Sequence, residues 1–246
     1  MLRSARRYDV VVYRAAGPDV DELVTFSRSL GGLLPVSAGA EPTHPEVDVS
    51  TLHPDKSVLA EVRKGTFFWH LDRTPQEVPE KATLLMAIEV SAEGGDTEFA
   101  NTHAAYDALP AARRVELEQL RVVHSFTAAQ LLLVHPDADA EQRAKGDRIP
   151  AREHPLAWKR RDGRSSLLIG ATAERVVGRP ESESRALLDE LLQHATRPEC
   201  VYRHGWTRGD LVVWDNTGML HRAIPYEPTS RRLMHRTTLV GEEAVA

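Results

Sequence analysis

The chain has 246 residues and a formal net charge of −5, a length that suits one large domain with a sizeable core. Its basic residues are scattered and form no lysine–arginine stripe, which argues against a nucleic-acid-binding protein. The single cysteine, Cys200, excludes an intramolecular disulfide and a cysteine-based zinc site, and fits a reducing compartment.

No segment of the sequence has the character of a membrane anchor or a leader. The apolar patch at 131–134 is far shorter than the roughly 20 residues that a membrane-spanning helix needs. The basic N-terminus is followed by a short apolar run at 10–12, too short for the core of a signal peptide. We therefore expect a cytoplasmic protein with no membrane partner.

The first half of the chain alternates short apolar runs with turn-forming residues. Apolar residues recur at helical spacing before Gly31-Gly32 and again over 102–120, where Pro110 starts a second segment. Residues 35–56 are expected to form a loop that contains one strand near Val47. The other strands expected in this half cover residues 9–14, 57–62, 65–72, 83–90 and 96–100.

The second half opens with a long irregular stretch. Residues 127–151 are polar, charged and alanine-rich, and a loop of this length in a compact domain is typical of a functional lid. Further on, Arg161-Asp-Gly163 is a hairpin signal and 182–194 has the spacing of an amphipathic helix. The strands expected here are 122–126, 154–158 and 165–169, and four more near Val201, Leu211, Leu220 and Leu233.

These elements predict one domain over 1–246 that is mainly β, with flanking helices. The many short strands indicate an antiparallel architecture rather than alternating strands and helices. The expected closed form is a jelly-roll barrel, that is, a double-stranded β-helix.

The last strand carries two arginines where apolar residues would be expected. Side chains alternate between the faces of a strand, so Arg232, Met234 and Arg236 share one face. His235 lies on the other face of the strand. Two buried guanidinium groups are costly without anionic partners. We therefore predict that this face lines a cavity that receives anions.

The stretch Trp69-His70-Leu71-Asp72 offers two metal ligands. In a strand, His70 and Asp72 would lie on one face, about 6.5–7 Å apart at their Cα atoms. Such a pair is common by chance, and an exposed His and Asp before a loop would give the same sequence pattern. His221, after a Val-Val-Trp strand, supplies a third ligand. Two histidines and one carboxylate form the facial triad typical of non-haem Fe(II) oxygen chemistry.

At this point the chain resembles the taurine dioxygenase/2,4-D dioxygenase (TauD/TfdA) family of Fe(II)- and 2-oxoglutarate-dependent dioxygenases. The resemblance covers residues 9–242. Several motifs in the same order and spacing are more specific than any one of them. They are Trp-His-x-Asp at 69–72, Gly-Gly-Asp-Thr-x-Phe-Ala at 94–100, Ala-Ala-Tyr at 104–106, Trp-x-x-Gly-Asp-Leu at 206–211, Trp-Asp-Asn at 214–216, His221, and Arg-Arg-x-Met-His-Arg at 231–236.

The resemblance implies roles for six residues. The residues that match the iron ligands are His70, Asp72 and His221. Arg232 matches the arginine that pairs with the far carboxylate of 2-oxoglutarate, and Thr97 matches the threonine that hydrogen-bonds the same group. Arg236 matches the arginine that holds the substrate's sulfonate in taurine dioxygenase. A guanidinium fork suits a carboxylate better than lysine does.

The implied reaction uses Fe(II), 2-oxoglutarate and O2 to oxidise a C–H bond of a small, acidic organic substrate, with release of succinate and CO2. Family members that halogenate lack the ligand carboxylate, so Asp72 favours hydroxylation, desaturation or another oxidation. The implied partners are therefore small molecules, with no nucleic acid and no membrane. A homo-oligomeric assembly stays open.

The chain departs from the family where taurine dioxygenase has a His-Pro-Val-Tyr stretch that contacts substrate. The matching residues here are Leu34-Pro35-Val36-Ser37, which argues against taurine and predicts a more apolar substrate pocket. Residues 131–134 could form an apolar wall over that pocket or a buried strand.

Two other functions use the same residues. A metal-dependent hydrolase or isomerase on a similar barrel could hold zinc with the same three ligands. A catalytically idle member of the family could serve as a binding protein. Arg232 and Thr97 favour the oxygenase over the hydrolase, because a hydrolase needs no dicarboxylate clamp. The complete triad argues against an idle protein.

Overall fold

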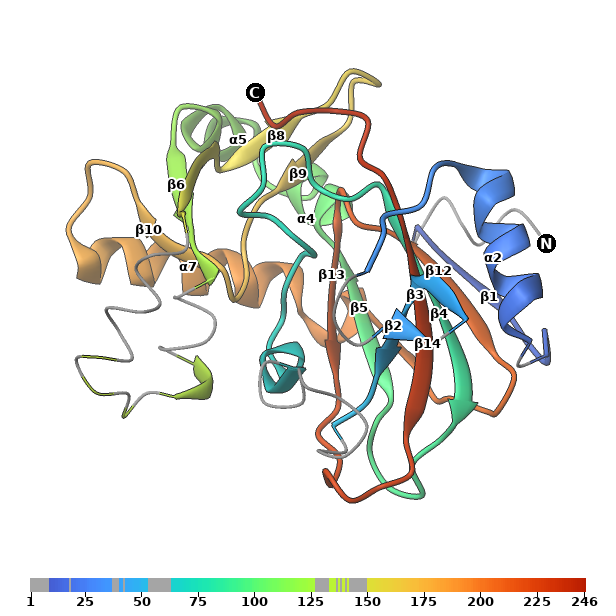
Figure 1. Cartoon of the computed structure of the whole chain (residues 1–246). Coiled ribbons are helices and arrows are strands. Elements are labelled where there is room, and N and C mark those ends of the chain that lie inside the picture. The colour runs from blue at the N-terminus through green and yellow to red at the C-terminus, as the bar shows by residue number, and fades with distance from the viewer. Residues whose placement is uncertain are drawn as a thin grey trace.

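The fold was analysed in a computed structural model, which describes residues 9–17, 19–36, 40–41, 43–52, 63–126, 133–135, 137, 139, 141 and 150–246. Two antiparallel sheets form its centre (Figure 1). The major sheet has the order β1-β12-β4-β14-β3-β2. Its strands are Val10–Tyr13 (β1), Leu211–Asp215 (β12), Ala82–Glu89 (β4), Leu233–Leu239 (β14), His44–Ser50 (β3) and Ala40–Glu41 (β2).

The minor sheet has the order β11-β5-β13, and a single bridge extends it. Its strands are Val201–His204 (β11), Thr97–Asn101 (β5) and Met219–Ala223 (β13). His70 forms an isolated antiparallel bridge with His221 of β13. The outer edge of this sheet is therefore the place where the Trp-His-x-Asp segment joins the barrel.

The space between the two sheets is an apolar core. Leu85, Trp214 and Met234 of the major sheet pack against Phe99 and Met219 of the minor sheet, and all are buried. The chain passes back and forth between these two facing sheets, which together make the double-stranded β-helix that the sequence predicts. The predicted fold class is confirmed.

The major sheet is covered on its outer side by α2, Val20–Leu30. Asp19 caps this helix by accepting the N–H of Glu22, as expected for an aspartate before a helix. Strand β4 shows the alternation that results: Leu84 packs under α2 while Leu85 faces the barrel interior.

A helical layer covers the outer side of the minor sheet (Figure 1). Its core joins Trp69, Leu71 and Leu220 to apolar side chains of the helices. The helices are Thr102–Asp107 (α4), Ala111–Glu118 (α5) and Glu181–Ala195 (α7), with a short 3-10 turn at Pro198–Cys200 (η4). The strands of this layer are Arg121–His124 (β6), Arg152–Pro155 (β7), Ala157–Lys159 (β8), Ser165–Leu167 (β9) and Ala173–Val176 (β10).

The strand predicted at 65–72 is wrong. Lys64–Phe67 forms a 3-10 turn (η2), and only His70 pairs with a strand. The cause is local: the Thr66 hydroxyl bonds back to the carbonyl of Arg63, and Phe68 N–H bonds to Gly65, which closes the turn. His70 and Asp72 are therefore not aligned by a common strand.

Several other expectations were incomplete. The strands β2 and β10 were not predicted, because each has only a few residues and no clear alternation. The strand predicted at 57–62 and most of the predicted lid at 127–151 lie outside the described residues. In the described part of the chain, no helix is long and apolar enough to cross a membrane.

Candidate active site

Two histidines meet at the edge of the minor sheet. His70 and His221 lie opposite each other, and their ring centroids are 4.2 Å apart. The Nδ1 atom of His70 is 2.8 Å from the carbonyl of Phe68, and that of His221 is 3.2 Å from the carbonyl of Met219. A carbonyl only accepts, so each Nδ1 carries the proton and each Nε2 keeps its lone pair.

Asp72 faces both of these lone pairs. Its Oδ1 lies 3.7 Å from Nε2 of His70, and its Oδ2 lies 3.5 Å from Nε2 of His221. Metal–ligand distances of about 2.0–2.2 Å place neighbouring ligand atoms roughly 3–3.6 Å apart, close to these values. The three ligand atoms lie within 4.8 Å of one another, so the group can hold a metal ion.

The charge states also suit a metal. Burial, together with the nearby His221, lowers the pKa of His70 to about 4, so its ring is neutral near pH 7. Burial opposes ionisation of Asp72, but Arg236 and His221 outweigh it and hold the pKa of this carboxyl well below its usual range. One carboxylate and two imidazoles form a donor set suited to a divalent transition metal.

Asp72 is oriented by hydrogen bonds from two sides. Oδ2 accepts the Thr83 hydroxyl at 3.1 Å and Nη2 of Arg236 at 2.9 Å. The Thr83 oxygen in turn accepts the side-chain amide of Asn216 at 2.8 Å. Asn216 belongs to the Trp-Asp-Asn motif at 214–216, to which the sequence assigned no role in the site. Its position behind Thr83 instead makes it a support for the carboxylate, as is common around metal ligands.

A cavity of about 60 Å³ opens beside the triad. Both histidines line it, together with three arginines. The remaining lining residues come from both sheets, from η2 and from the loop before β14, and they are Ser50, Thr66, Leu85, Thr97, Trp214, Ala223 and Tyr226. Arg232 and Arg236 therefore reach one cavity, as the alternation in the last strand predicted.

Arg232 is a buried cation whose partners are neutral. Its Nε donates to the carbonyl of Gly95 at 3.1 Å and its Nη1 to the hydroxyl of Tyr226 at 3.5 Å, and its guanidinium lies 4.9 Å from that ring's centroid. Within the described ranges no carboxylate forms an ion pair with it. Burial lowers the pKa of Arg232, which marks an uncompensated charge.

Thr97 lies on the same cavity wall and is nearly inaccessible to solvent. Its hydroxyl oxygen accepts the indole N–H of Trp206 at 3.0 Å. That bond leaves the hydroxyl proton of Thr97 available for a ligand. Thr97 and Arg232 thus offer a neutral and a charged donor to one cavity, as an elongated dicarboxylate would need.

Arg236 has two acidic partners. Its Nη2 bonds Asp72 at 2.9 Å and Glu80 at 3.0 Å, whereas Glu89 pairs with Arg231. These carboxylates raise the pKa of Arg236 although burial opposes the rise. In the part of the chain that the structure describes, its Nε is buried without a hydrogen-bond partner.

Three site residues escaped the sequence reasoning, namely Arg63, Glu80 and Tyr226. None belongs to a periodic pattern. Arg63 directly precedes η2, whereas Glu80 and Tyr226 come from irregular segments. Arg63 is paired with Asp48 of β3 at 2.6 Å. In the sequence, the only signal for Arg63 was a polar run before Trp-His-x-Asp, and the only signal for Tyr226 was its position after His221.

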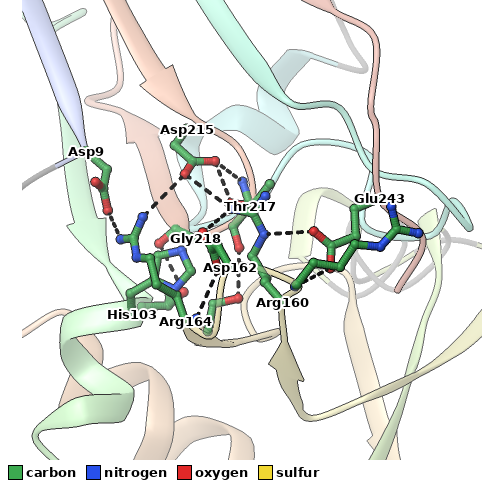
Figure 2. A network of polar contacts seen from close by, with 12 residues as sticks. Asp9, His103, Arg160, Asp162, Arg164, Asp215, Thr217, Gly218 and Glu243 are labelled. Carbon is green, nitrogen blue, oxygen red and sulfur yellow. Dashed lines mark hydrogen bonds and ion pairs between the residues drawn. The ribbon is translucent and has the colours of Figure 1, made fainter. Parts of the chain in front are cut away.

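A second group of potential ligands, Asp9, His103 and Asp215, lies at the turn between β12 and β13. Figure 2 shows Arg164 between the two carboxylates, bonded to Asp9 and 3.9 Å from Asp215. Beside it, Arg160 bonds the hydroxyl of Thr217 at 2.6 Å. Guanidinium groups thus take the place that a cation would need, and the network ties the β8–β9 hairpin to this turn.

The predicted apolar wall is described only in part. Leu133 lines a separate cavity of about 170 Å³, formed with Trp69 and α7 on the outer side of the minor sheet. Residues 131 and 132 lie outside the described residues, as does Ser37. Leu34 donates its backbone N–H to Thr238 at 2.9 Å and does not line the triad cavity.

Comparison with known proteins identifies the family. Residues 1–238 match the taurine catabolism dioxygenase TauD, TfdA family. An alpha-ketoglutarate-dependent 2,4-dichlorophenoxyacetate dioxygenase from Burkholderia sp. (strain RASC) is 37% identical over 94% of this chain and 82% of its own. Pentalenolactone F synthase from Streptomyces arenae is 32% identical, covering 96% of this chain and 84% of its own.

Solved structures give the same result. AAD-2 in complex with Mn(II) and N-oxalylglycine superimposes with a TM-score of 0.80 at 28% identity, over 99% of this chain and 86% of that one. A taurine dioxygenase from Burkholderia xenovorans gives a TM-score of 0.78 at 30% identity, over 98% and 79%. The chain belongs to the TauD/TfdA family of 2-oxoglutarate-dependent dioxygenases and is an oxidoreductase, as its sequence predicts.

Proposed function

We propose that this protein is an Fe(II)- and 2-oxoglutarate-dependent oxygenase that oxidises a C–H bond of a small organic substrate. The observation that carries the proposal is the pairing of the His70, Asp72 and His221 group with Arg232. Arg232 is buried on the wall of the same cavity and lacks a carboxylate partner among the described residues. The relatives' dependence on 2-oxoglutarate supports the same assignment.

In this proposal the three ligands hold Fe(II), and the far carboxylate of 2-oxoglutarate binds Arg232 and Thr97. Bound iron and 2-oxoglutarate supply oxidising power from O2, with release of succinate and CO2. The residues of the chain position the reactants. Trp206 fixes the Thr97 hydroxyl, while Thr83 and Asn216 fix the carboxylate of Asp72. The apolar core behind Trp214 and Phe99 keeps water from the inner side of the site.

Hydroxylation is the favoured outcome, with desaturation as the alternative. Asp72 occupies the ligand position that halogenating members of the family leave vacant. Its hydrogen bonds to Thr83 and Arg236 keep it turned toward the histidines. A chloride ion would have to displace this supported carboxylate.

A zinc hydrolase or isomerase is the competing function. It would use the same three ligands but would give no role to a buried arginine that lacks a carboxylate. A catalytically idle binding protein would be expected to lose at least one ligand or the support of Asp72. We therefore favour the oxygenase over both.

The decisive test is spectroscopic. Purified protein with Fe(II) and 2-oxoglutarate under anaerobic conditions should show a weak visible charge-transfer band, which requires both to bind one metal centre. The Asp72→Ala and His221→Ala variants should lack it. A correctly folded wild-type protein without the band would refute the proposal. Succinate release measured across candidate substrates then identifies the compound oxidised.

The acid group predicted for the substrate is a separate matter. Relatives that act on 2,4-dichlorophenoxyacetate or (S)-phenoxypropionate have an organic acid as substrate. Here the arginine expected to bind such an acid is already paired with Asp72 and Glu80. Whether the cavity can bind a substrate acid therefore depends on the charge balance of its three arginines.

A further inference from the structure

The three arginines of the triad cavity differ in their charge balance. Arg63 is paired with Asp48 at 2.6 Å, and Arg236 with both Asp72 and Glu80. Within the described ranges, only Arg232 lacks a carboxylate partner. If Arg232 binds 2-oxoglutarate, no uncompensated guanidinium in this part of the chain is left for a second anion.

Glu80 is built firmly into this arrangement. Its side chain is 3% exposed, and its two oxygens contact two different arginines. Oε2 bonds Nη2 of Arg236 at 3.0 Å, and Oε1 lies 2.5 Å from Nε of Arg73. Both contacts are charge-assisted, which makes them short and strong.

The chain between Asp72 and Glu80 explains how this carboxylate reaches the site. Arg73 has a φ of 49° in the left-handed region, which turns the chain directly after the metal-ligand segment. Its carbonyl accepts the N–H of Gln76 at 2.9 Å and closes a turn. His154, from β7, lies 2.9 Å from the carbonyl of Thr74 and holds the loop in place.

Metal binding does not release Arg236 from this pairing. A divalent ion on Asp72 would draw charge from that carboxylate, but Glu80, which bonds the same Nη2 of Arg236 at 3.0 Å, would keep neutralising it. A substrate carboxylate at Arg236 would add a further negative charge to a guanidinium group that already holds Asp72 and Glu80. Like charges at this distance in a buried site are unfavourable. By contrast, an uncharged oxygen near Arg236 would add no negative charge beside Glu80.

We propose that Glu80 neutralises Arg236 permanently, so that this site selects a substrate whose polar end is an uncharged acceptor, such as an amide, ester or alcohol, over one ending in a carboxylate or sulfonate. This inference rests on the proposed function, which supplies the metal and assigns Arg232 to 2-oxoglutarate. Glu80 is then the specificity-determining residue, acting through Arg236.

The first experiment uses acetate as the test anion on protein loaded with Fe(II) and 2-oxoglutarate. Loading itself gives the charge-transfer band, so failure of the proposed function would be seen before acetate is added. Wild-type protein should show little acetate-dependent change in the band. Glu80→Gln keeps a hydrogen-bond acceptor beside Arg236 but removes the charge, and should bind acetate on the order of tenfold more tightly.

Two variants make this result specific. Glu98→Gln removes another half-buried carboxylate, paired with Arg222 at 2.8 Å outside the cavity, and should behave as wild type. In the double variant Glu80→Gln/Arg236→Met, the gain in acetate affinity should disappear, because the guanidinium that binds acetate has been removed. Equal acetate binding in wild type and Glu80→Gln, or none in either, would overturn the role of Glu80.

The second experiment needs no variant, and so stands even if Glu80→Gln does not fold. Pairs of acids and their primary amides, beginning with phenoxyacetate and phenoxyacetamide, are compared on wild-type protein by succinate release and by their shift of the charge-transfer band. The amide should surpass the acid in every pair that gives a signal. A wild-type preference for the acids would reject the inference and leave the oxygenase assignment intact.

Discussion

His70 and His221 exchange their backbone hydrogen bonds. The N–H of His70 donates to the carbonyl of His221 at 3.1 Å, and the N–H of His221 donates to the carbonyl of His70 at 2.9 Å. Two residues far apart in the sequence are thus held as a single bridge at a sheet edge. The relative position of their rings depends on this backbone contact, and so does any metal affinity.

Gly170 supports that bridge from behind, so we expect Gly170→Ala to disturb it. A Cβ atom there would lie 2.6 Å from the carbonyl oxygen of Trp69 and 3.3 Å from Cα of His70. The free energy of unfolding of the variant should fall by about 1–3 kcal/mol more than backbone strain alone would cause. Mn(II) affinity, measured by calorimetry, should fall on the order of tenfold.

Gly163→Ala is the matched control for this prediction. Gly163 also has a positive φ, of 87°, but a Cβ atom there would meet nothing within 4 Å. It should show only backbone strain of about 1–2 kcal/mol and normal Mn(II) affinity. Equal metal affinity in the two variants would show that the bridge does not set the ligand geometry.

Replacing Arg232 should weaken 2-oxoglutarate binding far more than replacing Arg236. Arg232 has only neutral partners, whereas Arg236 is neutralised by Asp72 and Glu80. Loss of a buried charge pair costs about 2–5 kcal/mol, so Arg232→Ala should weaken binding by roughly 30-fold or more. Arg236→Ala should change it less than about tenfold. Titration of the charge-transfer band with 2-oxoglutarate measures both, and the reverse ranking would refute the assignment.

The Trp206→Phe variant tests whether Thr97 is oriented by its neighbour. The indole N–H bonds the Thr97 hydroxyl oxygen at 3.0 Å, and phenylalanine keeps the ring but not the donor. A neutral hydrogen bond contributes about 0.5–1.5 kcal/mol, so 2-oxoglutarate should bind roughly 2–10-fold more weakly. Thr97→Val, which removes the hydroxyl itself, should have the larger effect. A larger effect of Trp206→Phe would place the hydroxyl outside the binding site.

Acid should destabilise the metal-free protein in part through His124. This ring is fully buried beside His154, and burial, followed by the charge of His154, lowers its pKa to about 3. Between its unfolded pKa of about 6.5 and about 3, the unfolded state binds a proton that the folded state does not. Folding stability therefore falls as the pH decreases through this window.

The His124→Gln variant should lose part of that pH dependence. One proton accounts for up to about 1.4 kcal/mol per pH unit. Urea denaturation of wild-type and variant protein at several pH values between about 7.5 and 5 gives the two slopes. Parallel slopes would mean that His124 can accept a proton in the folded state.

Much of the barrel was predictable because alternation and turn residues are local signals. The strands at 83–90 and 96–100 were predicted within one residue or two of β4 and β5, and the helix at 182–194 matches α7. The segment 65–72 was mispredicted as a strand, because the bond from the Thr66 hydroxyl to the Arg63 carbonyl and the backbone bond from Phe68 to Gly65 close a turn in spite of its apolar pattern.

The candidate site was likewise predictable only in part. The alternation expected for Arg232, Met234 and Arg236 placed two arginines and one apolar side chain on the inner face. The structure agrees, although Arg232 lies just before β14. The sequence could not pair Arg236 with Glu80, since that contact depends on a left-handed turn at Arg73. The support of Asp72 by Asn216 through Thr83 was equally hidden.

The sequence by itself determined the family, the barrel and the residue types of the triad, because these follow from motif spacing and from strand alternation along the chain. Only the tertiary structure decided which charges neutralise each other inside the cavity. Ion pairing depends on distances of about 3 Å between side chains that loops bring together. For this reason the same arginine that the sequence assigned to an acidic substrate is found already neutralised by a carboxylate of the chain.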